Sequence, residues 1–287
     1  MPNAVEPPSE SPTRLEAAYA LMADATPPWR PIAGGTDLMV QVTGEIGAPP
    51  ERVLDLWALD ELRGIRLEGD ELVIGALTTY TEIRRSPIVA EFVPSLAECA
   101  ATIGAAQIQN RGTIGGNVVN ASPAGDTLPV LLAAGARIVL GSAAGERVVA
   151  ADAFWTGYRA TARRDDELVT AVHIPIVPGR EIRFRKVGTR RAQAISKVVM
   201  ALVWTPDADR WTDVRLALGS VAATPIRVPR TESVLEGAPP HRDVADAAAE
   251  ALAAEITPID DVRSTAEYRR AVAARVLHRL IRDAGGW

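Results

Sequence analysis

The hydrophobic pattern changes its period several times along the chain, and each change predicts the end of one element and the start of another. Leu15, Ala18, Leu21 and Met22 have the spacing of one helix face. Thr79 and Glu82 have the spacing of a capping box at the start of a short helix. Further helices are predicted at 39–42, 94–106 and 127–134, and strands at 29–33, 52–56, 64–67, 72–76, 136–140, 147–149 and 167–174.

The last third of the chain has a different pattern, in which three strands precede three helices. The strands are predicted at 181–188, 194–205 and 213–220, and the helices at 230–236, 243–255 and 264–283, the last opened by a capping box of Ser264 and Glu267. Two prolines and a glycine in 175–180 indicate a domain boundary. We therefore expect one domain over 1–175, with subdomains at about 1–57 and 58–175, and a second over 176–287.

The segment from Ile103 to Asp126 interrupts the apolar pattern with five glycines and three asparagines. We predict that it is a loop around a ligand. Gly112, Gly115 and Gly116 permit positive φ and close approach, and successive N–H groups in such a loop suit a pyrophosphate. Asp126 suits a sugar hydroxyl or a ring N–H. The alternative interpretation is a glycine-rich corner that only turns the chain.

A second glycine pair lies in the sequence AGGTDL, from Ala33 to Leu38, between a predicted strand and a predicted helix. A turn of this kind places phosphate oxygens against unpaired backbone amides. Thr36 or Asp37 equally suits a simple helix cap. This segment lacks the GxGxxG pattern, and the chain has no P-loop motif. The two segments together predict two glycine loops that face phosphate.

Composition excludes several classes of function. The net charge is -5 with 47% hydrophobic residues, which argues against nucleic acid as a partner. The single Cys99 forms no intrachain disulfide or cysteine cluster, so no metal site is predicted in this chain. The start of the chain, from Met1 to Pro12, lacks the pattern of a signal peptide, and no apolar run suits a membrane span. A cytoplasmic setting is therefore expected.

The stretch from Arg180 to Lys197 is strongly basic. Such a stretch is either a solvated face or a surface that holds phosphates or docks a partner. The three histidines are scattered at His173, His241 and His278, which is typical of surface or core positions, so no catalytic residue is predicted. The basic residues are Arg180, Arg183, Arg185, Lys186, Arg190, Arg191 and Lys197, against Glu181 alone.

Three segments together closely resemble the FAD-binding medium subunit of the molybdenum hydroxylases, the family of xanthine dehydrogenase and carbon monoxide dehydrogenase. They are AGGTDL at 33–38, TIGGNVVNASPAGD at 113–126 and KVGTRRAQAISKV at 186–198. The resemblance covers nearly the whole chain from about Leu15. It implies an α+β fold: a vanillyl-alcohol-oxidase-type (PCMH-type) FAD-binding domain of two α+β subdomains, followed by a small C-terminal domain like that of the carbon monoxide dehydrogenase flavoprotein, with a three-stranded antiparallel sheet and helices.

The resemblance also implies which residues contact the FAD. In some members the residue that matches Ile103 is aromatic and lies beside the flavin ring, so the contact of Ile103 is expected to be apolar packing. The implied contacts are Pro31, Ile32, Ala33, Gly34, Gly35, Thr36, Asp37, Leu38, Ile103, Thr113, Ile114, Gly115, Gly116, Asn117, Asp126, Leu168 and Lys186.

The implied function is that of an electron-transfer subunit of a heterotrimeric oxidoreductase. In the family a large molybdopterin subunit hydroxylates the substrate, and [2Fe-2S] clusters of a small subunit pass electrons through FAD to NAD+ or another acceptor. The segment 186–198 favours the xanthine dehydrogenase type over the carbon monoxide type. One alternative is a self-sufficient FAD-dependent oxidoreductase of the same fold. Another is a non-catalytic protein whose glycine loops are structural or bind a different nucleotide.

Overall fold

A small parallel sheet opens the structure. The computed structural model describes residues 7–23, 26–43, 48–190 and 193–287. Strand β3 lies between β1 and β2 and runs parallel to both, and Leu54 at its centre packs in one buried cluster with Ala18 and Met22 of α1. The elements are β1 (Ser9–Glu10), α1 (Leu15–Ala23), β2 (Arg30–Ile32), α2 (Leu38–Thr43) and β3 (Val53–Asp55).

A five-stranded antiparallel sheet forms the middle of the molecule. Its central strand β10 pairs with β5 on one side and with β6 on the other, in the order β4-β5-β10-β6-β7. Leu72, Ile74 and Val172 belong to the main core on one face, and Val73 is equally buried on the other face, so the central strands are covered on both sides. The strands are β4 (Ile65–Glu68), β5 (Glu71–Gly75), β6 (Arg137–Ser142), β7 (Gly145–Ala150) and β10 (Leu168–Pro175).

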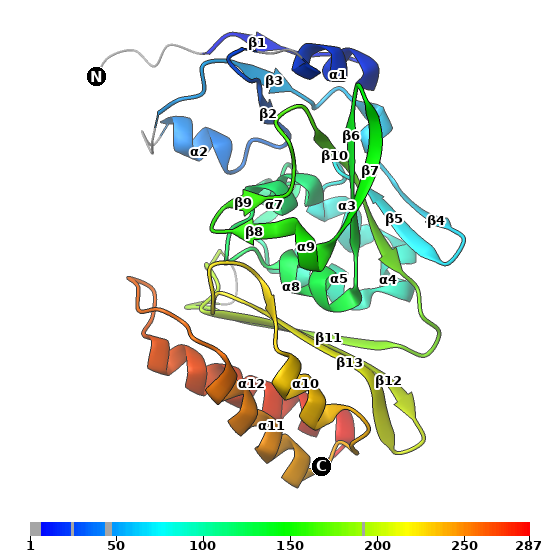
Figure 1. Ribbon diagram of the computed structural model, residues 1–287, viewed down its shortest axis with the longest axis vertical. Helices are drawn as coiled ribbons and strands as arrows, with labels where there is room; N and C mark the ends of the chain where they lie inside the picture. The colour runs from blue at the N-terminus through cyan, green and yellow to red at the C-terminus, as the bar shows by residue number, and fades with distance from the viewer. Residues whose placement is uncertain (1–6, 24–25, 44–47, 191–192) are drawn as a thin grey trace.

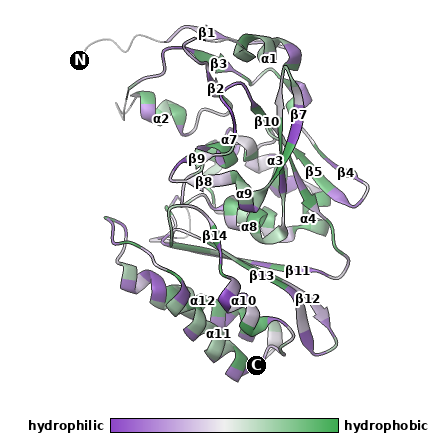
Figure 2. Cartoon of the chain, viewed as in Figure 1, coloured by the Kyte–Doolittle hydropathy of each residue, from purple (hydrophilic) through white to green (hydrophobic). Residues whose placement is uncertain are grey.

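Short helices cover one face of this sheet (Figure 1). Thr79 begins α3 with the predicted capping box, since its side chain accepts from the Glu82 amide and the Glu82 carboxylate accepts from the Thr79 amide. Helix α8 is buried at every position and is mainly hydrophobic (Figure 2). These elements are α3 (Tyr80–Arg85), α4 (Pro87–Phe92), α5 (Pro94–Ala101), α6 (Ala106–Gln109), α7 (Ile114–Asn120), α8 (Thr127–Ala134) and α9 (Ala151–Phe154), with the hairpin β8 (Trp155–Gly157) and β9 (Ala160–Thr161) after α9. The short helix η1 (Asp60–Leu62) precedes β4, and its Leu62 packs in the core of the first sheet.

An antiparallel sheet in the order β11-β12-β13-β14 separates these helices from the three C-terminal helices (Figure 1). Val199, Ala201 and Val203 of β12 belong to the core of the first half, whereas Met200 and Leu202 belong to the core beneath the C-terminal helices. The elements are β11 (Glu181–Val187), β12 (Val198–Asp207), β13 (Arg210–Gly219), β14 (Ile226–Arg227), α10 (Pro229–Leu235), α11 (Arg242–Glu255) and α12 (Ala266–Gly285).

The structure corrects two details of the predicted C-terminal domain. The expected three-stranded sheet has a fourth, short strand, because Ile226 and Arg227 pair with the end of β13. The capping box predicted at Ser264 is wrong by one residue, since the side chain of Thr265 caps α12 and accepts from the Tyr268 amide. Ser264 instead donates its amide to Asp261, which holds a turn ahead of the helix.

The prediction that the whole segment 103–126 is a loop is also wrong. Residues 114–120 form helix α7, which begins where the Thr113 side chain accepts from the Gly116 amide and ends at Ala121, whose φ is 47°. The helix predicted over 94–106 ends at Ala101, and α6 follows as a separate turn. Two adjacent glycines weaken the helical signal of α7, and the capping threonine outweighs that effect.

Candidate functional site

A pocket lies between the turn that follows β2 and the start of α7. Both predicted glycine segments line it, as do the first residues of β10. Of the expected contact residues, the structure brings together Pro31, Ile32, Ala33, Gly34, Gly35, Thr36, Asp37, Leu38, Ile103, Thr113, Gly115, Gly116, Asn117 and Leu168. Ile114, Asp126 and Lys186 do not line the pocket wall.

The first glycine turn presents backbone amides to the pocket. Gly35 has a φ of +73°, and a Cβ on Gly34 would lie 1.7 Å from the carbonyl oxygen of Arg111, so only glycine permits this approach of the two segments. Among the described residues, the N–H groups of 34–37 have no hydrogen-bond acceptor. Four adjacent unpaired donors in the wall of a pocket form an arrangement that suits a phosphate group.

The second glycine segment is held by backbone contacts with the chain between β5 and α3. Thr113 forms an isolated β-bridge with Thr79, and the amide of Gly115 donates to the carbonyl of Ala76 at 2.9 Å. A Cβ on Gly115 would lie 2.6 Å from the Cβ of Ala76, so this glycine is required for packing. Gly116 faces the other way: its Cβ would approach the Thr113 hydroxyl at 2.9 Å and Ala33 at 3.9 Å, on the side of the first glycine turn. Gly116 therefore keeps the space between the two segments open.

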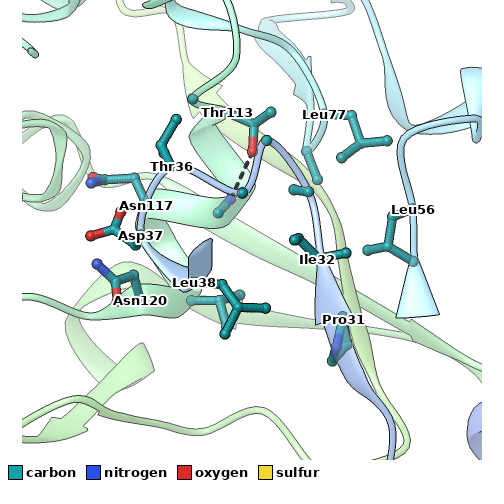
Figure 3. Close-up of a pocket in the computed structure, with 18 of the residues that line it drawn as sticks. Pro31, Ile32, Thr36, Asp37, Leu38, Leu56, Leu77, Thr113, Asn117 and Asn120 are labelled. Carbon is teal, nitrogen blue, oxygen red and sulfur yellow. Dashed lines mark hydrogen bonds between the residues drawn. The ribbon is translucent and has the colours of Figure 1, made fainter. Parts of the chain in front are cut away.

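Amide side chains gather on one side of the pocket with Asp37, as Figure 3 shows for Asn117 and Asn120. The Oδ1 atom of Asn117 accepts from the hydroxyl of Thr127. The Oδ1 atom of Asn120 accepts from Arg159 Nη1 at 2.7 Å. Because each carbonyl oxygen is already occupied, the NH₂ groups of these two amides remain as donors.

Asp126 and Lys186 pair with each other. Lys186 Nζ lies 2.6 Å from Asp126 Oδ2 and 3.0 Å from the carbonyl oxygen of Thr102, while the hydroxyl of Ser196 donates to the other Asp126 oxygen. Burial raises the pKa of the Asp126 carboxyl, and the charge and hydrogen bond of Lys186 oppose that shift. This group joins β11 to the residue before Ile103, so it lies next to the pocket without forming its wall.

The pocket also has charged and aromatic residues that the sequence pattern did not single out: Arg30, Tyr80, Arg163 and Glu167. Glu167 is buried and accepts from Arg147 Nε at 2.5 Å and Arg147 Nη2 at 2.8 Å. These hydrogen bonds hold the pKa of Glu167 below its ordinary value. In the sequence the charges before β10 resemble an exposed turn, and no local signal shows that Arg147 neutralises Glu167.

The basic stretch forms contacts within the chain. Arg180 donates to Asp213, Arg183 pairs with Glu181, Arg190 donates to the carbonyl of Gln193, and the ammonium of Lys197 lies 4.8 Å from the ring centre of Tyr268. Arg191 lies outside the described residues.

His173 contacts Glu71, His278 contacts Asp246, and His241 precedes α11; none of the three lines the pocket. In the described part of the chain, no group of three residues could hold a metal ion. The same part has no helix long and apolar enough to cross a membrane.

Two family models match the chain in succession. Residues 6–177 match the FAD binding domain in molybdopterin dehydrogenase, and residues 183–284 match the carbon monoxide dehydrogenase flavoprotein C-terminal domain. The chain is 32% identical to the carbon monoxide dehydrogenase medium chain of Hydrogenophaga pseudoflava over 96% of its own length and 95% of that protein. It is 30% identical to the xanthine dehydrogenase FAD-binding subunit of Escherichia coli O157:H7, over 95% of both chains.

A solved structure shows the same fold. A chain of quinoline 2-oxidoreductase from Pseudomonas putida 86 superposes with a TM-score of 0.92 at 27% identity, and the match covers 98% of both chains. The expected α+β fold, with an FAD-binding domain followed by a C-terminal domain, is thereby confirmed.

Proposed function

Because the chain belongs to the FAD-binding medium subunits of the molybdenum hydroxylase family, we propose that it holds one FAD in this pocket and transfers electrons within a larger complex. The bound flavin supplies the redox chemistry. The protein supplies the binding groups, fixes the orientation of the cofactor and keeps water from its buried part.

The observation that carries this proposal is the set of unpaired amides at 34–37 opposite the open face of Gly116. We assign these groups to the pyrophosphate, because successive N–H donors form an arrangement that binds an anionic diphosphate. The remaining wall is mainly apolar, as a large planar ligand requires. The residues present therefore fit FAD.

We assign the other expected contacts by the same proposal. Ile103 packs against the flavin, Asn117 donates to it, and Leu168 at the start of β10 borders it. Ile114 lies under the second glycine segment and supports it. The Asp126–Lys186 pair lies beside Ile103, where it orders the segment next to the flavin and is placed to tune its electrostatic environment.

We further propose that the electrons arrive from [2Fe-2S] clusters of a small partner subunit and that a large molybdopterin subunit hydroxylates the substrate. The chain's own residues support this division, since the described part has only the buried Cys99 and no group of metal ligands. The FAD is proposed to pass these electrons to NAD+ or another acceptor. The form of segment 186–198 favours the xanthine dehydrogenase type, while relatives of the xanthine and carbon monoxide types match at similar identity.

The first test is an absorbance spectrum of the purified chain, followed by heat release and chromatography of any ligand. FAD in near one-to-one amount supports the proposal, and a chain that neither carries nor takes up FAD contradicts it.

A second test separates the subunit from a self-sufficient oxidoreductase. Affinity purification from the native cell is expected to bring down a cysteine-rich chain and a large molybdopterin chain. A chain that turns over a substrate with no other subunit present contradicts the subunit role.

A further inference from the structure

Two arginines line the same pocket without a carboxylate partner of their own. Arg30 is the first residue of β2, and Arg163 lies in the loop between β9 and β10. Arg163 Nη1 donates to the carbonyl oxygens of Arg164 and Glu167, both at 2.7 Å. Among the described residues the guanidinium of Arg30 has no hydrogen bond or ion pair, and only its backbone amide is bonded, to the carbonyl of Arg52. Neither cation is therefore neutralised by a direct contact.

The acidic groups around the two arginines do not cancel the positive charge of these arginines within the pocket. Burial lowers the pKa of the Arg163 guanidinium, Asp165 opposes this shift, and the positive charge of Arg30 adds to it. Asp165 is exposed, and Asp166 beside it is half-buried. Glu167 lines the pocket too, but Arg147 and the Arg164 amide occupy both of its oxygens. Two like charges that face one pocket favour a ligand group that attracts both of them.

The two arginines lie at a definite place relative to the phosphate-binding turn. Ala33 follows Arg30 by three steps of extended chain, which span about 10 Å along the backbone, and this is the scale of a nucleoside. Figure 3 places Pro31, the neighbour of Arg30, away from the side where Asn117 and Asn120 gather. Gln41 of α2 lines the pocket with Arg30 and adds an amide that can donate and accept. The pocket therefore extends beyond the pyrophosphate position toward a cationic end.

We propose that Arg30 and Arg163 receive the AMP half of FAD and make this site select FAD over FMN; the inference rests on the proposed function. A guanidinium stacks on a planar aromatic ring and also binds phosphate oxygens, and an AMP group offers both. FMN lacks this half of the dinucleotide, so it gains nothing from either arginine. Arg163 is held in place by the backbone of its own loop, and Arg30 approaches from β2.

The test is a titration of the flavin-free full chain with FAD and, separately, with FMN. The variants are Arg30→Ala, Arg163→Gln and their double variant, and Arg85→Ala is the matched control because Arg85 is exposed and does not line the pocket. Each single variant is expected to raise the dissociation constant for FAD about tenfold, equivalent to about 1.4 kcal/mol. The constant for FMN stays unchanged, so the FAD-to-FMN selectivity falls by the same factor.

Two outcomes overturn the inference. Equal weakening of FAD and FMN places the arginines on the half that both flavins share, and unchanged FAD affinity shows that they do not contact the cofactor. If Arg163→Gln lowers the melting temperature, Arg30→Ala still tests the inference. The Arg30 side chain has no hydrogen bond or ion pair with another described residue, so its removal is not expected to disturb the fold. A wild-type chain that binds no FAD contradicts the proposed function itself, which is a different result from loss of selectivity.

Discussion

Adjacent residues of this site have separate roles, and the two glycines of α7 show it most directly. Gly115 is packed against Ala76, whereas Gly116 faces the first glycine turn. A side chain at the first position disturbs the core, and a side chain at the second fills the space assigned to the pyrophosphate.

We therefore expect Gly116→Val to lower FAD affinity by at least about tenfold, or about 1.4 kcal/mol, while the chain still folds. Flavin titration and circular dichroism of the same preparation measure the two effects. Gly115→Val is the control, and it is expected to reduce the yield of folded protein. Equal flavin content in wild type and Gly116→Val would contradict the assignment.

The Asp126–Lys186 pair sets a second expectation at this scale. Asp126→Ala leaves the ammonium of Lys186 buried with the carbonyl of Thr102 as its remaining partner. Removal of one partner of a buried ion pair costs about 3–5 kcal/mol, so we expect a large loss of stability in the flavin-free chain. Urea denaturation measures it, and Asp126→Ala with Lys186→Met is expected to recover part of the loss. Unchanged stability would show that the pair acts only on the flavin.

At the scale of elements, the loop between β9 and β10 depends on one ion pair. Glu167 accepts two hydrogen bonds from Arg147 and one from the Arg164 amide, and Arg163 donates to its backbone. The loop that carries Arg163 to the pocket is therefore ordered by Glu167.

This arrangement predicts a pH dependence. The pKa of Glu167 in the folded chain lies below its ordinary value of 4.5, so its contribution to stability is present above that pH and is lost as the pH falls through the folded value. Glu167→Gln is expected to lose about 1–3 kcal/mol at pH 7, and the difference from wild type shrinks below pH 4.5. Denaturation midpoints of both proteins across this range provide the measurement. A difference that stays constant with pH would contradict the role of the charge.

The elements also show how far sequence reasoning extends. Caps and period are local, so the capping box at Thr79, the helical face of α1 and the strands around β10 are predicted correctly. Helix α7 was missed because its glycines weaken the local helical signal, and its stability comes from contacts with residues such as Ala76 that lie far away in the sequence. Both glycine segments of the site can be recognised from their own local sequence. The pairing of Asp126 with Lys186 and the presence of Arg30 and Arg163 depend on tertiary structure.

At the scale of the whole molecule, the C-terminal sheet contributes to two cores. Phe184, Val199 and Ala201 pack with the helices of the first half, and the opposite face packs under α10–α12. The first of these cores therefore contains residues of both parts, although a proline-rich connection joins them.

We expect the two parts to unfold in a single transition. Hydrogen exchange over a temperature series should show α8 and β12 losing protection together, because each covers apolar surface of the other. Ala201→Asp, which places a charge in the shared core, is expected to destabilise both by about 3–5 kcal/mol, while Ala247→Asp on the exposed face of α11 has little effect. Two separate transitions would contradict the shared core.

The alternation along β12 has a practical consequence for recombining these proteins. Odd-numbered positions from Val199 to Val203 match the flavin-binding half, and the even-numbered positions match the C-terminal helices. A chimera that replaces the C-terminal domain at the linker therefore inherits foreign side chains on the surface facing α5 and α8. A better chimera keeps Val199, Ala201 and Val203 and replaces only the residues of β12 that face the C-terminal helices. In that chimera the side chains of both cores still pack against the partners for which they are suited.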